Sequence, residues 1–434
     1  MDESRMELKV EATVVTRSEG TAPPPQDAAA PNKRPHEFWE DVIFSAVLAL
    51  VVILVNGTFV GQEFSHFTYR VLQRQLVPRD NPQVAVVDIS QLAVDEHRAT
   101  PRGPLKNLLE ALVEYRPRAI GIDIDFSPEE RNGQLHFIEP DDPRFFAFCE
   151  SLRERREVPI YLGISRTQSL PPDQWLGFAR FQNLAAALLL PYDPIKSPRS
   201  LAPTGTGEKQ TTAPTMSAAV AGTVQSGRLE IFFEKFAKRQ IAEGIELEES
   251  FIDYSLRERL AEEYIHVSAH DFEDSAALKA AIAPQRSLIS NKILLLGDIR
   301  GGSDLFENPV GGDAIPGVLV HALAANTLST APLYGFPEHT RLWLDFALAL
   351  LVSLGATELE NYYEDRRRLI TVLTIGLVTA IICFGMLVNH TRILWDDFLF
   401  VALALAVHPF CHRTFEKLRH DLHVWLRPRK RGVA

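Results

Sequence analysis

The chain has 434 residues, of which 46% are apolar and 23% charged, and its length favours two folded units over one. This composition excludes general disorder and a collagen-like or coiled-coil chain, and it is typical of a globular or mixed membrane protein. The net charge of −11 argues against a general nucleic-acid-binding protein.

The first predicted element is a transmembrane helix. Val42 to Val60 contains no charged residue over 19 positions, about enough helix to cross the roughly 30 Å core of a bilayer. About 40 polar residues precede this run and no small-residue cleavage site follows it, so we expect a retained anchor and not a signal peptide. Residues 1–40 are therefore predicted to be a disordered cytoplasmic segment, and residues 41–60 the first span.

Residues 61–340 are predicted to fold as one α/β domain. Strands of nearly continuous apolar character alternate with helices, which is typical of a mostly parallel, mixed sheet covered on both faces. The single cysteine of this region, Cys149, indicates a domain held together by its core and not by disulfides. The predicted strands are Gln83–Asp88, Arg118–Asp125, Val158–Ile164 and Lys292–Gly297; the predicted helices are Pro104–Tyr115 and Val318–Leu328, with Arg228–Tyr264 as a charged, helix-favouring stretch and Pro191–Thr215 as a surface loop.

Three more apolar runs follow within residues 341–410, so we expect four transmembrane helices, one before the domain and three after it. Residues 411–434 form a tail with seven basic and two acidic residues, and three arginines lie between the second and third spans. Positive charge near spans marks the cytoplasmic side, so residues 61–340, with a net charge of −10, are expected to face outward. The three predicted spans are roughly Leu342–Leu359, Leu369–Val388 and Ile393–Phe410.

Short motifs then follow one another along the outward region. The strongest are Asn291-Lys-Ile-Leu-Leu-Leu-Gly-Asp298 and Ala119-Ile-Gly-Ile-Asp-Ile-Asp-Phe126, with Val84-Ala-Val-Val-Asp-Ile89 before them and Ile315-Pro-Gly317 after them. In this order they resemble the type 2 CHASE family, the extracellular sensor domains associated with cyclases and histidine kinases. The chain departs from that family where it reads His97-Arg-Ala-Thr-Pro101 in place of a Trp-containing segment, and in residues 168–250.

The resemblance implies a sensor and not an enzyme. It implies a bacterial inner-membrane, multi-pass protein whose main domain faces the periplasm and binds an unidentified extracytoplasmic ligand without a cofactor. From the mode of action of such a sensor we expect a homodimer. Such sensors usually continue into a kinase, cyclase or phosphatase. Here about 24 residues follow the last span, so we expect the signal to pass to a separate cytoplasmic effector.

Carboxylates follow three of the predicted strands. Asp88, Asp123 and Asp298 each lie at or beside a strand's carboxyl end, and Asp125 lies at the same end as Asp123. Ligands of open α/β sheets bind outside these ends, so one interpretation is that the carboxylates converge on a ligand. The alternative is that each Asp caps the next turn or helix, as this residue commonly does.

Three further residues complete the candidate ligand site. Arg102 opens a helix after Pro101, and its guanidinium suits either a carboxylate ligand or an internal partner such as Asp123. Asp304 and His321 belong to the resembling stretches, and His321 suits either a structural contact near the core or a pH-responsive role. The predicted ligand-binding residues are Asp88, Arg102, Asp123, Asp125, Asp298, Asp304 and His321, and no catalytic or metal-binding residue is predicted.

Charges near the spans have interfacial or functional interpretations. Asp345 lies one turn into its apolar run, whereas Asp396 and Asp397 lie near the outer end of theirs. Arg70, Arg74 and Arg79 are exceptions to the charge rule on the outward side, although long domains cross the membrane largely regardless of charge. In the tail, anionic lipids of the inner leaflet are the expected partners of Arg427, Arg429, Lys430 and Arg431.

Two other functions fit the same residues. Asp123 and Asp125 after one strand, with Asp298 and Asp304 after a later one, follow the carboxylate pattern of haloacid-dehalogenase-like phosphohydrolases, in which the first Asp is the nucleophile and the later pair binds magnesium. That match is imperfect, because Ser127 replaces the usual Thr or Val and no lysine is suitably placed. The other alternative is a membrane scaffold subunit that senses nothing.

Overall fold

The computed structural model describes most of residues 61–340 and the helices α1, α2, α11 and α12 near the two ends of that region. The sequence-predicted residues Asp396, Asp397, Arg427, Arg429, Lys430 and Arg431 lie outside the described residues. The described residues are 35–56, 58–76, 82–92, 100–165, 172–188, 195–198, 200–201, 213–222, 249–300, 304–330, 332–336, 338–362, 366–395, 414 and 417.

A six-stranded sheet in the order β11-β1-β12-β2-β5-β6 forms the centre of the domain, and every neighbouring pair in it is parallel. The apolar runs that predict strands are strands here, because a sheet buried on both faces needs apolar residues at successive positions. Two strands, β6 and β11, were not predicted. The bounds are β1 Val84–Asp88, β2 Ala119–Asp125, β5 Ile160–Ser165, β6 Ala185–Leu188, β11 Ile265–His266 and β12 Ile293–Gly297.

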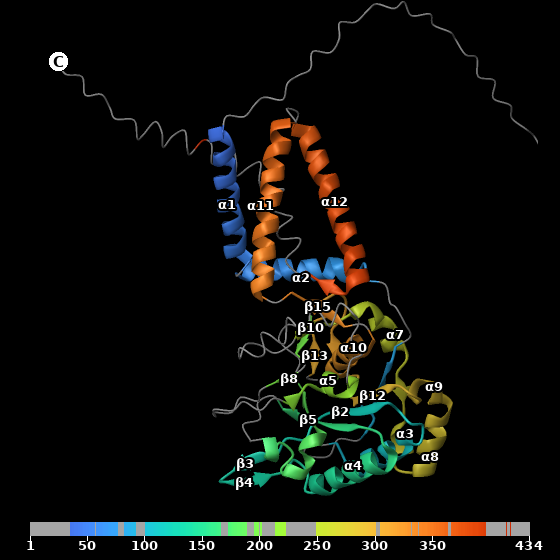
Figure 1. The fold of residues 1–434 in the computed structure, drawn as a ribbon. Coiled ribbons are helices and arrows are strands. Elements are labelled where there is room, and N and C mark those ends of the chain that lie inside the picture. The colour runs from blue at the N-terminus through green and yellow to red at the C-terminus, as the bar shows by residue number, and fades with distance from the viewer. Residues whose placement is uncertain are drawn as a thin grey trace, which may run out of the picture.

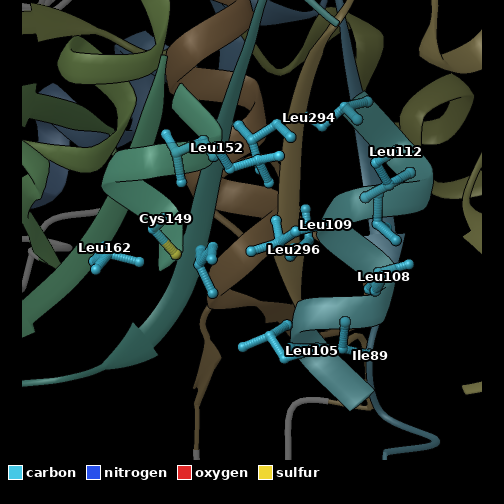
Figure 2. Close-up of a cluster of buried hydrophobic side chains, with 14 of the residues drawn as sticks. Ile89, Leu105, Leu108, Leu109, Leu112, Cys149, Leu152, Leu162, Leu294 and Leu296 are labelled. Carbon is cyan, nitrogen blue, oxygen red and sulfur yellow. The ribbon is translucent and has the colours of Figure 1, made fainter. Parts of the chain in front are cut away.

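Helices cover both faces of this sheet. On one face, α3 (Arg102–Val113), α4 (Asp142–Arg156) and α8 (Ser275–Ile282) enclose the larger core, in which leucines of α3 lie against Leu294 and Leu296 of β12 (Figure 2). On the other face, α5 (Met216–Ala221) and α10 (Gly317–Thr330) pack on Val84, Val86, Ile293 and Leu295. The α/β class and the mostly parallel sheet are therefore confirmed.

A second, smaller sheet, in the order β16-β15-β10-β7, lies at the end of the domain from which the long helices extend (Figure 1). Its strands come from distant parts of the chain, and two of them differ from the sequence prediction. Pro191–Thr215, expected to be a surface loop, contains β7 and the short strands β8 (Ser200–Leu201) and β9 (Ala213–Pro214), and Ile195 is buried. The bounds are β7 Lys196–Pro198, β10 Glu249–Phe251, β15 Leu333–Gly335 and β16 Ile393–Leu394.

The remaining short elements complete the domain. The described part of Arg228–Tyr264 begins at residue 249 and contains β10 and one α-helix, so the prediction of a helical stretch holds only for α7. Two hairpins pair β3 with β4 and β13 with β14. Their bounds, with the other helices, are α7 Arg257–Glu262, α9 Arg286–Ile289, β3 Glu129–Arg131, β4 Gln134–His136, β13 Leu305–Phe306 and β14 Ile315–Pro316.

Three long helices extend from one end of the domain, and a shorter helix, α2, lies across that end (Figure 1). The long ones are α1 (Pro35–Asn56), α11 (Glu338–Tyr362) and α12 (Arg366–Thr391), and α2 is Phe59–Gln73. Helices α1 and α11 pack through small residues, with Ala49 and Ala349 buried and the Ser353 hydroxyl donating to Ser45 Oγ at 3.0 Å.

The described residues support fewer spans than the sequence predicts. Thr371–Thr391 is long and apolar enough to cross a membrane, and α1 with α2 passes the same test only if the bent pair counts as one span. The run Val42–Val60 is not one straight helix, because the chain turns by 87° between α1 and α2. Ile393 and Leu394, expected to open the last span, form β16 beside β15.

Candidate functional site

Parallel pairing aligns the carboxyl ends of β1, β12 and β2 at one edge of the sheet. Asp88 is opposite Gly297, the residue before Asp298, and Ile122 is opposite Leu296. The predicted carboxylates therefore begin from neighbouring strands, but each strand sends alternate side chains to opposite faces. Which of them meet depends on the face to which each side chain points.

Asp123 points to the face covered by α10. Ile120 and Ile122 belong to the core under α3 and α4, so the alternation of the strand places Asp123 on the other face. There its Oδ1 lies 4.0 Å from Nε2 of His321, and the two side chains are 9% and 3% exposed. Burial raises the pKa of Asp123 to about 7.

Asp304 reaches the same place from the β13–β14 hairpin. The hairpin sets Asp304 beside Gly317, whose backbone N–H donates to the Asp304 carbonyl oxygen at 3.0 Å. The Asp304 carboxylate lies against the Gly317 Cα so closely that any larger residue at 317 would displace it. Partial burial and then the charge of Asp123 raise the pKa of Asp304, and His321 lowers it.

His321 completes a cluster that we name the Asp123 cluster (Asp123, Asp304 and His321). It lies one turn into α10, a helix whose residues are buried almost throughout. Burial lowers the pKa of His321 to about 4, so the imidazole is neutral at neutral pH, and its Nδ1 has no hydrogen-bond partner among the described residues. Two carboxylates and a neutral imidazole favour a proton or a cationic, hydrogen-bond-donating group over an anion.

The other predicted carboxylates accept hydrogen bonds from nearby backbone N–H groups, as the capping alternative expects. Asp88 accepts from Ser90 N at 2.9 Å, Asp125 from Ser127 N at 2.9 Å, and Asp298 from Arg300 N at 2.8 Å. Each bond closes a turn directly after a strand. Asp88 also lies 3.5 Å from His266 Nδ1, and Asp298 lies 3.7 Å from Arg300 Nε at an exposed position.

Arg102 has an internal partner on the opposite face of the sheet. Its Nε donates to Asp142 Oδ1 at 2.6 Å, with both side chains buried, and its guanidinium stacks over Phe126 at 4.5 Å from the ring centroid. Asp142 Oδ2 also accepts from Glu139 N at 3.0 Å. The internal-pair interpretation is therefore correct, but the partner is Asp142 and not Asp123, because Asp123 points away from this face.

A magnesium-dependent phosphohydrolase would need Asp123, Asp125, Asp298 and Asp304 around one metal. In the part of the chain that the structure describes, no three His, Cys, Asp or Glu side chains are placed to share a metal ion. Asp125 and Asp298 bind their own turns and are exposed at the surface. Of the four carboxylates in the sequence pattern of that enzyme class, Asp123 and Asp304 thus lie in one cluster, whereas Asp125 and Asp298 bind separate turns.

A second constellation, which we name the junction, joins the domain to the C-terminal end of α12. Arg392, which follows α12, pairs through Nη2 with Asp253 Oδ2 at 2.8 Å, and both side chains are almost buried. Arg392 has φ of 57°, a left-handed conformation that costs an L-residue about 1–2 kcal/mol. Its carbonyl accepts from Tyr334 N at 2.8 Å, so β16 is held against β15.

The junction also includes α2 and α10. Asn389 of α12 donates to the Gln75 carbonyl at 2.7 Å, and Gln73 donates to the Ile252 carbonyl at 3.0 Å. On the domain side, the backbone N–H of Asp253 donates to Thr327 Oγ1 of α10 at 2.9 Å. Since α10 also carries His321, a single helix contacts both the Asp123 cluster and the junction.

Asp345 of α11 lies beside the junction and is buried. It accepts a 2.7 Å hydrogen bond from Trp395 Nε1, which ties α11 to the segment after α12. Sequence reasoning missed this contact, and it missed Asp142, Gln73, Asn389 and Arg392. A signal existed for Asp142, because it precedes Pro143 at a helix start.

Comparison with known proteins agrees with this architecture. The family model of the CHASE2 domain matches residues 45–357, which is more than half of the chain and extends from α1 into α11. No curated protein and no solved structure shows a significant match. CHASE2 domains are extracellular sensor domains of membrane proteins. The chain therefore belongs to the CHASE2 family of sensor domains.

Proposed function

We propose that the protein is a bacterial inner-membrane sensor whose periplasmic domain responds to a ligand or to the state of the envelope and passes the response through its membrane helices to a separate cytoplasmic effector. The junction is the observation that carries this proposal. Arg392 at the end of α12 forms a nearly buried ion pair with Asp253, whose backbone N–H donates to Thr327 of α10, so a movement of α10 acts on the end of α12 through Asp253.

The Asp123 cluster is the proposed input. A ligand or a proton shifts a two-state domain only if it binds the two states with different affinity. Asp123 meets this condition, because its pKa of about 7 lies close to neutral pH and any movement of α10 that admits water or a cation favours its ionised form. Asp88, Arg102, Asp125 and Asp298 are less suited, since a ligand would first have to displace the partners described above.

Proposed partners on the inner side follow from the charge pattern. Anionic lipids bind the basic tail through Arg427, Arg429, Lys430 and Arg431, at about 1 kcal/mol for each residue near the surface. A homodimer provides the relative movement of helices that an effector reads. Cross-linking from residues 411–434 in native membranes tests the effector: capture of a kinase, nucleotide cyclase or protease supports the proposal, and capture of only further copies of the chain contradicts it.

The relay is tested by hydrogen exchange in the full-length protein in lipid nanodiscs. Asp123→Asn keeps the shape of the side chain and removes its charge, so at pH 8 it should change amide exchange in residues 385–395. In an Arg392→Gln background the same substitution should leave that segment unchanged, because the ion pair to Asp253 is lost. Hydrogen exchange and mass spectrometry report both effects on one sample.

The matched control is Arg144→Gln, which breaks an exposed ion pair with Asp141 far from the junction. It should preserve the response to Asp123→Asn. An equal response with and without the Arg392 pair would place the relay elsewhere, and no response in either background would remove the Asp123 cluster as the input.

A further inference from the structure

Helix α2 has one face that is fully engaged with the domain. Tyr69, Leu72 and Gln73 are buried against it, Tyr69 Oη donates to the Ile252 carbonyl at 2.6 Å, and Gln73 binds the same carbonyl. Tyr69 also packs on Phe251 and Tyr254 of the domain. These contacts fix the rotation of α2 about its own axis, and so determine which residues point away from the domain.

The opposite face carries a stripe of apolar side chains, two arginines and one glutamate. Val60, Phe67 and Arg74 are seven residues apart, so they lie on the same side of the helix two turns from one another, and Glu63 and Arg70 lie between them. Val60 and Phe67 are 50% and 52% exposed, and Phe59 at the start of the helix is 72% exposed. Large apolar side chains that stay in water forgo the free energy that their burial would provide.

The position of α2 shows what faces this stripe. Figure 1 shows α2 across the end of the domain, on the side from which α1, α11 and α12 extend. The apolar span Thr371–Thr391 ends beside α2, where Asn389 binds the Gln75 carbonyl. Helix α2 therefore lies at the depth at which the apolar part of α12 ends, with its stripe directed toward the membrane.

We propose that α2 lies flat in the outer leaflet, with Val60 and Phe67 at the headgroup–acyl boundary and Arg70 and Arg74 on lipid phosphates. This inference rests on the membrane anchoring in the proposed function. Amphipathic helices bind the interface in this way, with apolar residues buried about 5–10 Å and basic residues extended toward the headgroups. It gives a physical reason for two of the outward arginines that do not follow the charge rule.

The charges agree with lipid phosphates as the partner. The ion pairs of the described residues include neither Arg70 nor Arg74, and Arg70 Nε has no hydrogen-bond partner among those residues, so a phosphate would supply an acceptor. Gln73 and Gln75 at the end of α2 bind the domain and α12, so lipids on the stripe act on the junction itself. A change in the surrounding lipids thereby alters the contacts of the junction without a soluble ligand.

The test measures the depth of spin labels in full-length protein in phosphatidylcholine–phosphatidylglycerol vesicles. Cys383→Ser and Cys411→Ser leave only Cys149, which is fully buried and does not react. The measured quantity is the ratio of collisions with oxygen to collisions with a water-soluble nickel complex. This ratio should be several-fold higher for a label at Phe67→Cys than for a label at Ile138→Cys. Ile138 is the matched control, because it is similarly exposed but lies at the other end of the domain.

A label at Ile382→Cys, on an exposed face of α12, reports membrane insertion itself. If that label is in lipid while the labels at Phe67→Cys and Val60→Cys match the aqueous control, α2 is not interfacial and only this inference fails. If all labels match the aqueous control, the membrane anchoring of the proposed function fails as well. Dipolar broadening between labels at residue 67 would assign the stripe to a second copy of the chain and overturn lipid as the partner.

Lipid charge gives an independent arm of the test. Replacing phosphatidylglycerol by phosphatidylcholine should reduce the depth of the label at residue 67, because the phosphatidylglycerol headgroup carries a net negative charge that attracts Arg74. The dependence should disappear in Arg74→Glu and persist in Arg144→Glu, which changes an exposed arginine of the distant helix α4. Equal dependence in both variants would show that Arg74 does not contact the headgroups.

Discussion

Two buried pairs of ionisable residues lie on opposite faces of the same sheet, and their surroundings differ in nearly every respect. Arg102 and Asp142 form a direct ion pair at 2.6 Å, supported by an aromatic ring and a further backbone hydrogen bond. Asp123 and His321 are as deeply buried but 4.0 Å apart, which is too far for a hydrogen bond. One region compensates its charges, and the other avoids charge by shifting its pKa values.

The difference separates a structural contact from a responsive one. A compensated pair holds its two elements together over a wide pH range, because each charge stabilises the other. An uncompensated group near its pKa changes charge when its surroundings change slightly, and so couples conformation to protons or ligands. For this reason we assign the input of the sensor to the Asp123 cluster and a structural role to Arg102.

The largest expected effect is the loss of the compensated pair. Asp142→Ala leaves Arg102 buried without its partner, and should lower the free energy of unfolding of the domain by about 3–5 kcal/mol. Urea unfolding of the full-length protein in nanodiscs, followed by hydrogen exchange in β2, measures this change. Asp141→Ala, one residue earlier and in an exposed ion pair, should change stability little. Similar losses in both variants would contradict a structural role for the pair.

The second effect is a dependence of stability on pH. Removing the Asp142 carboxylate should destabilise the domain, whereas removing the Asp123 carboxylate should stabilise it above neutral pH. Its pKa rises from 3.8 in the unfolded chain to about 7 in the folded one, so the unfolded state releases its proton first and stability falls as pH rises from about 4 to 7. Asp123→Asn should remove that fall and make the protein more stable at pH 8, by about 2–3 kcal/mol. At pH 4 the two proteins should be alike.

His321 adds a loss of folding stability at acidic pH. Its pKa of about 4 lies below the ordinary 6.5, so folding is favoured above pH 6.5 and stability is lost as pH falls toward 4. The two groups therefore oppose each other between pH 4 and 7, and Asp123→Asn should expose the His321 contribution alone. Asp125→Asn is the control, since Asp125 is exposed. A pH profile unchanged by Asp123→Asn would show that the carboxyl is ionised in the folded state.

The main sheet could be predicted from sequence, whereas the contacts of the site could not. A short run rich in β-branched residues, such as Val84–Asp88, favours a buried strand, whereas β11 has only two residues and β6 begins with three alanines, so neither gives a clear pattern. The bend between α1 and α2 was also missed. Apolar residues continue on both sides of Asn56-Gly57, and composition does not show that the helix axis changes direction there.

Side-chain direction explains the partial success at the site. The strand-end rule correctly places Asp88, Asp123 and Asp298 at one edge, yet it does not say which of them meets a helix from the other face. His321 reaches Asp123 only because α10 crosses the sheet, and Asp142 reaches Arg102 because α4 begins beside α3. Such contacts depend on three-dimensional packing between segments that are distant in sequence, as the pairing of Asp253 with Arg392 also does.

The smallest expected effect tests the comparison most directly. A double-mutant cycle with Arg102→Met and Asp142→Leu should give a coupling energy of more than about 2 kcal/mol, as expected for a buried, hydrogen-bonded pair. The corresponding cycle with Asp123→Asn and His321→Gln should give less than about 0.5 kcal/mol at pH 5.5, where both groups are neutral in the folded state. A coupling above about 1 kcal/mol in the second cycle would mean that Asp123 and His321 share a direct hydrogen bond. The cluster would then be a second compensated pair, and its assignment as the input of the sensor would lose its physical basis.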